Sequence, residues 1–242
     1  MHDGPRRLAG RAALVTGASR GIGAAIARRL SREGARVALV SRDARALEAL
    51  AAELGNGAVA AACDLHLPGA ADVVQAALDD LGADEPDILV NNAGSFVVAP
   101  AHETSVDLFR ETLELNLTAP FAFVRTFLPA MRRRGSGHIV TVGSIADRAA
   151  FPGNAAYAAS KHGLRALHEV LRAELRGSGV RTSLVSPGPV DTTLWDVVDP
   201  DRREGFTPRA QMLDADSVAD AVSYVVTAPA QLNVDELRLS RS

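Results

Sequence analysis

The stretch Arg11-Ala-Ala-Leu-Val-Thr16-Gly17-Ala-Ser-Arg20-Gly21-Ile-Gly23 begins as a short apolar strand and runs straight into a glycine-rich turn. An apolar helical pattern follows, and Gly34 is placed to end that helix. Such a strand, turn and helix suit a pyrophosphate, because glycines let the backbone approach phosphates and a helix N-terminus offers free N–H groups. We therefore predict a dinucleotide site at residues 17–23. The spacing is G-x-x-x-G-x-G, so an ordinary glycine-rich turn is the alternative.

The end of the second predicted strand, residues 36–41, bears on which dinucleotide the chain binds. A site that prefers NAD places an acidic residue at this end, where it bonds the ribose 2′-hydroxyl. Here the residue is the neutral Ser41, Arg42 follows it, and Arg20 lies in the glycine turn. Two guanidinium groups suit a 2′-phosphate because they form charge-assisted, often bidentate hydrogen bonds with it. We therefore predict NADP as the cofactor. The alternative is that both arginines are solvated surface residues.

Strands and helices alternate along the rest of the chain. Further strands are predicted at 58–63, 88–94, 137–142, 180–185 and 235–239, and helices at 43–54, 69–81, 106–133, 155–176 and 216–227. Alternation of this kind favours a parallel sheet with right-handed crossovers and helices on both faces. The predicted fold class is α/β, a single Rossmann-type doubly wound parallel sheet of about seven strands. No linker or repeat divides the chain, so we expect one domain over residues 1–242.

Composition limits the function classes that remain. The chain has 242 residues, of which 47% are apolar, and a formal net charge of −3, which argues against nucleic acid or a membrane surface as a partner. Its one cysteine, Cys63, can form neither an intrachain disulfide nor a cysteine-based metal site, and no histidine spacing suggests a metal. Residues 1–10 are polar, and no apolar run is long enough to span a membrane. We expect a cytoplasmic protein without a metal.

Tyr157 and Lys161 lie four residues apart in a segment that contains no glycine or proline. On an α-helix this spacing puts both side chains on one face, one turn apart. An ammonium group beside a phenol favours the phenolate, which lowers the phenol pKa toward the range useful for acid–base catalysis. The pair taken alone is weak evidence, since an exposed helix face produces the same spacing. The context of the pair therefore has to decide.

That context resembles the short-chain dehydrogenase/reductase family over essentially the whole chain. The matching pieces, in family order, are Thr16-Gly17-x-x-x-Gly21-x-Gly23, Asp64, Asn91-Asn92-Ala93-Gly94, Asn116, Ser144, Tyr157-x-x-x-Lys161 and Pro187-Gly188. The resemblance implies an NADP(H)-dependent oxidoreductase, a ketoreductase type of enzyme that moves a hydride between nicotinamide and a carbonyl or secondary alcohol. It also implies the sheet order 3-2-1-4-5-6-7 and a homo-oligomer, either a dimer or a homotetramer.

Four residues receive catalytic roles from this resemblance. Tyr157 would be the general acid in carbonyl reduction and the general base in alcohol oxidation. Ser144 would hold and polarise the substrate oxygen; the alternative is a turn or helix-cap serine. Lys161 would lower the pKa of Tyr157 and bind the nicotinamide ribose. Asn116 would hold a water that links Lys161 to bulk solvent; the alternative is a solvent-facing asparagine.

Further cofactor contacts are implied by position. Asp64, with Leu65 beside it, would meet the adenine; Asn91, Ala93 and Gly94 would flank the riboses. Pro187, Gly188, Val190 and Thr192 would line the carboxamide. The full predicted cofactor set is Gly17, Ser19, Arg20, Gly21, Ile22, Gly23, Ser41, Arg42, Asp64, Leu65, Asn91, Ala93, Gly94, Tyr157, Lys161, Pro187, Gly188, Val190 and Thr192.

Departures from the family pattern concern the substrate. No glycine pair follows Val234-Asp235, which argues against a fatty-acid-type 3-oxoacyl reductase and favours small hydroxy acids, alcohols or ketones. Gly143 and Asp147 are milder departures, and we expect them to leave the chemistry untouched. A 3-oxoacyl-thioester reductase and a non-catalytic NADP-binding sensor or regulator remain the alternative functions.

Two further expectations concern mobility and assembly. Residues 190–213 mix aromatic, charged and proline residues after Pro187-Gly188-Pro189, and we predict a mobile substrate lid there; the alternative is a rigid surface excursion. Ala155, Ala159, Leu167, Leu171 and Leu175 suggest a second apolar stripe on the Tyr157 helix, which would pair subunits across a two-fold axis.

Overall fold

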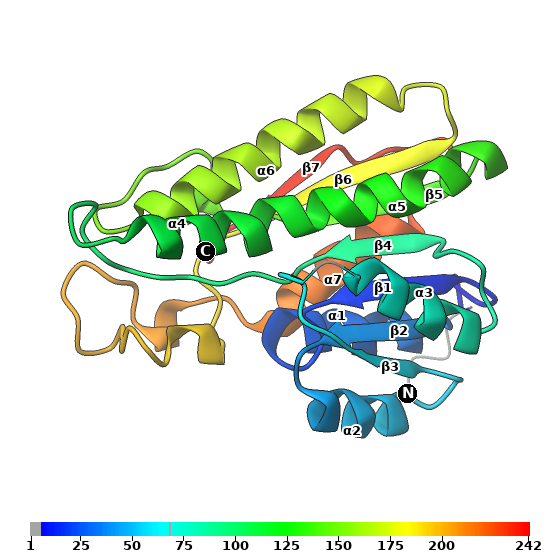
Figure 1. Cartoon of the computed structure of the whole chain (residues 1–242), viewed down its shortest axis with the longest axis horizontal. Coiled ribbons are helices and arrows are strands. Elements are labelled where there is room, and N and C mark those ends of the chain that lie inside the picture. The colour runs from blue at the N-terminus through cyan, green and yellow to red at the C-terminus, as the bar shows by residue number, and fades with distance from the viewer. Residues whose placement is uncertain (1–5, 68) are drawn as a thin grey trace.

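The computed structural model describes residues 6–67 and 69–242, so residues 1–5 of the polar N-terminal stretch lie outside it. Seven strands form one sheet in the order β3-β2-β1-β4-β5-β6-β7, and all neighbours pair in parallel. The strands are β1 (Ala12–Thr16), β2 (Arg36–Ser41), β3 (Val59–Ala62), β4 (Ile88–Asn91), β5 (Gly137–Val142), β6 (Val180–Pro187) and β7 (Glu236–Leu239) (Figure 1). The predicted Rossmann-type sheet and the strand order implied by the resemblance are both confirmed.

Helices cover both faces of the sheet. They are α1 (Gly21–Arg32), α2 (Ala44–Leu54), α3 (Ala70–Asp80), α4 (Val106–Leu113), α5 (Ala119–Arg134), α6 (Ala155–Glu174) and α7 (Ala215–Thr227). Figure 1 shows α4, α5 and α6 in front of the sheet and α1 and α7 behind it. None of the described helices is both long and apolar enough to cross a membrane.

Each face of the sheet has its own apolar core. On β1, Ala13 and Val15 belong to the core shared with α1, α2 and α7, whereas Ala12 and Leu14 belong to the core shared with α3, α5 and α6. This alternation follows from the two-residue period of a strand. It explains why the central strands are almost continuously apolar, since a parallel sheet is buried on both faces.

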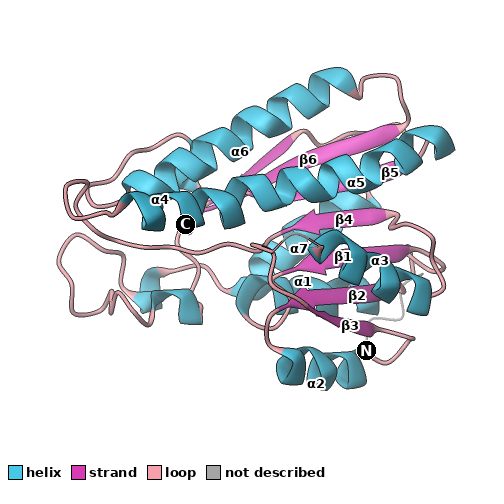
Figure 2. Cartoon of the chain, in the orientation of Figure 1, coloured by secondary structure: helices cyan, strands magenta, loops and turns pink. Residues whose placement is uncertain are grey.

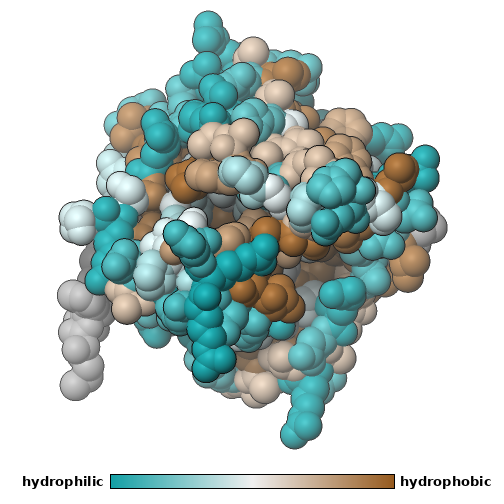
Figure 3. All heavy atoms as spheres, turned by 90° about the vertical axis from the view of Figure 1, so that its left-hand side faces the viewer, coloured by the Kyte–Doolittle hydropathy of each residue, from teal (hydrophilic) through white to brown (hydrophobic). Residues whose placement is uncertain are grey.

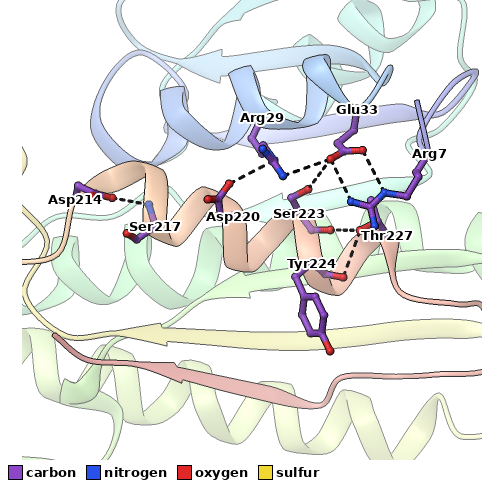
Figure 4. A network of polar contacts seen from close by, with 9 residues as sticks. All are labelled: Arg7, Arg29, Glu33, Asp214, Ser217, Asp220, Ser223, Tyr224 and Thr227. Atoms are coloured by element: carbon purple, nitrogen blue, oxygen red, sulfur yellow. Dashed lines mark hydrogen bonds and ion pairs between the residues drawn. The ribbon is translucent and has the colours of Figure 1, made fainter. Parts of the chain in front are cut away.

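Polar contacts join α7 to α1 on the edge of the first core (Figure 4). Arg29 of α1 pairs with Asp220 of α7 at 3.4 Å. The carboxylate of Glu33, just after α1, pairs with Arg7 at 3.2 Å and accepts a hydrogen bond from the Ser223 hydroxyl at 3.4 Å. These contacts fix the outer end of α1, and the opposite end of that helix faces the predicted phosphate site.

The long helix predicted over residues 106–133 is interrupted. A π-helical turn, Glu114–Thr118, separates α4 from α5. Pro120 lies in the first turn of α5 and has no N–H to donate to the carbonyl of Asn116, four residues earlier. The proline is thus compatible with the wider turn, which places Asn116 inside the protein, fully buried.

The prediction of a second apolar stripe on α6 is wrong for the leucines in the C-terminal half of the helix. Leu171 and Leu175 belong to the core under α6, and Leu167 packs against that core, while Ala155 and Ala159 are exposed. A leucine four residues from the last one continues the core face of a helix, because 3.6 residues make one turn. Those leucines therefore cover the sheet and are not free to meet a partner.

Candidate active site

An open groove of about 410 Å³ lies where β1, β2, β3 and β4 end. Long loops gather at this edge of the sheet (Figure 2), and Figure 3 looks onto it and shows a hollow bordered by apolar and polar side chains. The strand order reverses between β1 and β4, the place where an open α/β sheet binds its ligand. Predicted cofactor residues that line the groove are Gly17, Ser19, Arg20, Gly21, Ile22, Gly23, Ser41, Arg42, Asp64, Leu65, Ala93, Gly94 and Thr192.

The other predicted cofactor residues lie outside the groove lining. They are Asn91, Tyr157, Lys161, Pro187, Gly188 and Val190. Residues that line the groove without having been predicted are Asp43, Cys63, His66, Asn92, Leu115, Thr193 and Leu194. Most of them directly adjoin predicted residues, so a wider window at each strand end could have found them.

The glycine turn is shaped to bring backbone close to a ligand. Gly17 has a φ of +68°, which is in the left-handed region, whereas the φ of Gly23 lies outside that region. A Cβ on Gly17 would lie 2.9 Å from the Cα of Ala93, and one on Gly23 only 2.2 Å from the carbonyl oxygen of Gly17. Side chains are therefore excluded at both positions. The first residues of α1 line the groove, and the free N–H groups of a helix N-terminus fit a phosphate-bearing dinucleotide.

Thr16 and Asn92 tie the two strands of the switch point together. The Thr16 hydroxyl accepts from the backbone N–H groups of Asn92 and Ala93, both at 3.0 Å, and the Asn92 amide donates to the Thr16 carbonyl at 2.9 Å. The neighbouring Asn91 side chain is buried, and neither of its amide atoms has a hydrogen-bond partner.

The groove carries positive charge from two exposed arginines near the ends of β1 and β2. Arg20 and Arg42 both line it. The nearest acid, Asp43, uses its side chain to cap α2 by accepting from the N–H of Ala46 at 3.0 Å. The Ser41 hydroxyl accepts from the Asp43 N–H at 3.2 Å. Asp43 is thereby held in a capping role, which leaves the end of β2 without an acid of the kind that bonds a ribose 2′-hydroxyl.

Asp64, predicted to meet the adenine, is paired with a residue that sequence reasoning passed over. Its carboxylate lies 2.7 Å from Nδ1 of His66 and accepts from the His66 N–H at 3.1 Å. The hydrogen bond from the His66 side chain is the main reason that the pKa of Asp64 is lowered, with Arg42 contributing. The two-residue spacing of an Asx turn was the available signal.

Ser144 and Tyr157 meet beyond the groove, at the carboxyl end of β5. Ser144 follows that strand and precedes a short 3₁₀ turn, Ile145–Asp147, whose Ala146 N–H it binds at 3.1 Å. Tyr157 lies in the first turn of α6, and the nearby Ser144 hydroxyl acts to lower the pKa of its phenol. Ser144 therefore serves as a turn serine and as a partner of the phenol at the same time.

Lys161 lies one turn along α6 from Tyr157, as the spacing predicts. Its ammonium is 5.6 Å from the centroid of the tyrosine ring and donates to the carbonyl of Val142 at 3.0 Å. The side chain is buried, and burial lowers the pKa of Lys161 to about 8 although Asp147 acts to raise it. Lys161 is also the only lysine in the chain, a signal that sequence reasoning missed.

The predicted lowering of the Tyr157 pKa is not observed in the protein alone. Burial raises that pKa, the Ser144 hydroxyl acts to lower it, and Asp147 raises it further. The ammonium of Lys161 donates to the Val142 carbonyl here. The phenol is therefore kept in its protonated form.

Asn116 is buried and not solvent-facing. Its side-chain oxygen accepts from the Ser95 N–H at 2.8 Å, and its amide donates to the Ser95 carbonyl and to the Ser160 hydroxyl, both at 3.0 Å. The side chain thus ties the loop after β4 to α6. Both N–H groups of the amide are used within the protein, so a water near Asn116 would have to use its main chain or the remaining lone pair.

A row of aromatic rings leads away from the phenol. Phe96 contacts Tyr157 edge to face with 4.9 Å between centroids, Trp195 contacts Phe96 at 5.0 Å, and Phe206 contacts Trp195 at 6.2 Å. Trp195 and Phe206 come from the segment 190–213, which is held by a backbone bridge between Val190 and Leu213. This row forms an apolar wall beside the phenol.

Within residues 6–67 and 69–242, no group of three histidine, cysteine or acidic side chains is arranged to hold a metal ion. His138 is buried against the Ser183 hydroxyl at 2.8 Å, and burial lowers its pKa to about 3. It packs as a neutral side chain in the sheet.

Fold and groove together define a Rossmann-type dinucleotide-binding protein. A family model described as short chain dehydrogenase matches residues 11–203. The chain belongs to the short chain dehydrogenase family and is an oxidoreductase of that family.

Individual relatives agree with this assignment. D-threitol dehydrogenase of Mycolicibacterium smegmatis is 39% identical over 241 residues, which cover 96% of this chain and 92% of that protein. Glycine betaine reductase of Emericella nidulans is 36% identical over 237 residues, but the chain spans only 18% of that longer protein. A metagenomic short-chain oxidoreductase crystallised with NADP is 36% identical, with a TM-score of 0.83 and coverage of 98% of this chain and 99% of that one.

Proposed function

We propose that the chain is an NADP(H)-dependent oxidoreductase that interconverts a small carbonyl compound and the corresponding secondary alcohol. The observation that carries this proposal is the meeting of Ser144 and Tyr157, with Lys161 one turn further, at the open edge of a glycine-lined dinucleotide groove. When bound, the cofactor supplies or accepts the hydride. The relatives named above support the reaction class, because their names include a dehydrogenase and a reductase.

Each residue of the site has a definite task in this proposal. In reduction, the phenol of Tyr157 gives its proton to the substrate oxygen as the hydride reaches the carbonyl carbon; in oxidation it takes the proton back. The Ser144 hydroxyl holds the same substrate oxygen. Lys161 binds the nicotinamide ribose and restores the phenol proton, and its pKa of about 8 suits it to exchange protons near neutral pH.

Asn116 is proposed to connect Lys161 with solvent through its main chain. Residue 120 is proline, so the Asn116 carbonyl lacks the usual α-helical donor and is able to accept from a water. The side chain serves to hold this carbonyl in place by its bonds to Ser95 and Ser160.

NADP is proposed over NAD because Arg20 and Arg42 line the groove and Asp43 is held as a helix cap. Arg42→Asp should weaken NADP binding by roughly 10- to 100-fold, the value of a lost charge-assisted hydrogen bond to phosphate, and should leave NAD binding equal or improved. Titration of each nucleotide, followed by the fluorescence of Trp195, measures both constants.

The matched control for Arg42→Asp is Arg45→Asp, the same charge change on the exposed first turn of α2. Arg45 does not line the groove, so its replacement should change both affinities only slightly. Tighter binding of NAD than of NADP by the unmodified protein would contradict the cofactor assignment.

Turnover of a panel of ketones, alcohols, polyols and 3-oxoacyl thioesters with NADP(H) tests the proposed function. Oxidation or reduction of small alcohols or ketones supports it, and a strong preference for the thioesters favours the 3-oxoacyl reductase alternative. Tight NADP binding without turnover of any member would favour the sensor. The intact set of Ser144, Tyr157 and Lys161 is the reason to place the enzyme first.

The segment 190–213 is proposed to cover the substrate. Its Trp195 and Phe206 continue the aromatic row that starts at Tyr157, so an apolar part of the substrate would exclude water from the reacting atoms. Arg209 binds Asp191 and Asp196, both at 2.6 Å, and holds the segment together as one unit. Movement of this segment as a lid stays a proposal.

A homo-oligomer of one domain per chain, dimer or tetramer, is also proposed. Large apolar side chains are exposed on the helices that cover the front of the sheet: Val106 at 64%, Phe121 at 49% and Val170 at 53%. Exposed apolar side chains on these helices favour burial against a second copy. The proposed compartment is the cytoplasm, since the chain's single cysteine is a free thiol.

A further inference from the structure

A completely buried aspartate lies under the catalytic site. Asp147 closes the short turn that begins after Ser144, and its side chain has no exposure to solvent. One carboxylate oxygen accepts from the Ser186 hydroxyl at 2.6 Å. The other pairs with Arg148 at 3.3 Å. A buried acid needs such partners, because an uncompensated charge in the interior is costly.

Ion pairs connect Asp147 through Arg148 to Glu236 on the last strand of the sheet. Arg148 also pairs with Glu236 of β7 at 2.5 Å. Room for the carboxylate comes from Gly143, since a Cβ there would lie 3.2 Å from the Asp147 oxygen and 2.6 Å from the Ser186 hydroxyl. Gly143, Asp147 and Glu236, the residue that follows Val234-Asp235 in place of a glycine, are the departures from the family pattern. They therefore form one network.

The charge of Asp147 acts on both proton-transfer groups of the site. The charged and titratable groups around it are Tyr157 and Lys161 from α6, Arg148 beside it, and Glu236 through Arg148. Asp147 raises the pKa of the Tyr157 phenol and of the Lys161 ammonium. A negative charge near a phenol disfavours the phenolate, and near an ammonium group it favours the charged form.

We propose that Asp147 is a positioning residue whose carboxylate extends the pH range in which Tyr157 stays protonated and so keeps the site competent for carbonyl reduction at alkaline pH. The inference rests on the proposed role of Tyr157 as acid and base. A protonated phenol is the acid that reduction consumes, whereas oxidation needs the phenolate. The arrangement keeps the phenol competent for reduction to higher pH than the same site without the aspartate.

The chain offers a direct measurement of this effect that needs no substrate. It contains two tyrosines, and Tyr224 is exposed on α7, away from the site. In a Tyr224→Phe background, the tyrosinate absorbance band reports Tyr157 alone. Titration is confined to the pH range in which circular dichroism shows the protein folded. Asp147→Asn keeps the size of the side chain and an oxygen for Ser186, and removes the charge.

Asp147→Asn should move the phenolate titration of Tyr157 down by about one pH unit. With a carbonyl and alcohol pair from the substrate panel, the acidic limb of oxidation and the alkaline limb of reduction should move down together by the same amount. Glu236→Gln, a change on a partly exposed residue, leaves Arg148 less neutralised and should move the titration in the same direction by less. It serves as the second variant if Asp147→Asn does not fold.

An unchanged Tyr157 titration in folded Asp147→Asn, or in Glu236→Gln if the first variant is unfolded, overturns the proposal and leaves Asp147 a purely structural residue. A shifted titration with unmoved pH profiles overturns the link to reduction. Failure of Tyr157→Phe to reduce turnover would refute the proposed function instead, and the titration would still measure the effect of the aspartate charge. The two failures are therefore distinguishable.

Discussion

Tyr157→Phe is expected to lower kcat by roughly 10²- to 10⁴-fold in both directions, the usual contribution of a positioned general acid or base. The substitution removes the phenolic hydroxyl and its proton but keeps the ring. The ring carries the edge-to-face contact with Phe96 at 4.9 Å, so the local packing should survive. The Kd for NADP should stay close to its original value, because the groove residues and the Lys161 ammonium proposed to bind the cofactor are unchanged.

The matched control is Tyr224→Phe, the same substitution at the chain's second tyrosine. Tyr224 is 58% exposed on α7, so this change should leave kcat and KM unaltered. Steady-state rates with the substrate identified from the panel provide the comparison. If Tyr157→Phe kept most of the original kcat, another group would have to supply the proton and the proposed mechanism would be wrong.

The sheet could be predicted from the sequence because each strand carries its own boundaries. Apolar runs such as residues 36–41 are bounded by turn residues, and a doubly wound sheet makes these runs apolar on both faces. The structure keeps every predicted strand, with changes of at most three residues at the ends. The glycine turn was equally legible, since only residues without a Cβ fit beside Gly17 and Gly23.

The features that sequence reasoning missed depend on contacts between distant residues. Residues 106–133 show one continuous helical period, yet the π-helical turn at Asn116 depends on its contacts with Ser95 and Ser160. The leucine stripe on α6 has the same spacing whether it meets a sheet or a partner. Asp147 and Glu236 are far apart in sequence, and the network that joins them is visible only in space.

The lone lysine was a readable signal. Apart from the histidines, every basic residue of the chain other than Lys161 is an arginine. An arginine cannot lose its proton in a protein, whereas a buried lysine shifts its pKa readily. The retention of lysine at this one position therefore agrees with a group that must exchange protons. It also makes the titration of this residue unusually easy to isolate.

Lys161→Met should abolish most of the turnover and weaken NADP binding, and yet stabilise the protein without cofactor. The ammonium is buried with one backbone acceptor, the Val142 carbonyl. Its pKa falls from 10.5 to about 8 because burial penalises the charge, a cost of roughly 3 kcal/mol. Methionine fills a similar volume without a charge. Losing the ammonium also removes a neighbour of Asp147, so we expect a net gain of about 1 to 2 kcal/mol.

The pH dependence gives this prediction its sign. The folded pKa of Lys161, about 8, lies below its unfolded value of 10.5, so between these pH values the unfolded chain binds more protons than the folded one. The free energy of unfolding contributed by Lys161 is therefore lowest below pH 8 and rises toward pH 10.5. The difference in unfolding free energy between Lys161→Met and the unmodified protein should be largest at neutral pH and shrink through this window.

Urea unfolding of both proteins at several pH values measures this difference directly. Cys63 and Tyr157, whose pKa values are raised by burial, also titrate at alkaline pH, but they are present in both proteins and cancel in the difference to a first approximation. A lower stability of Lys161→Met at neutral pH would show that the ammonium is compensated in the folded protein. In that case the buried ammonium would not lower the stability of the folded protein.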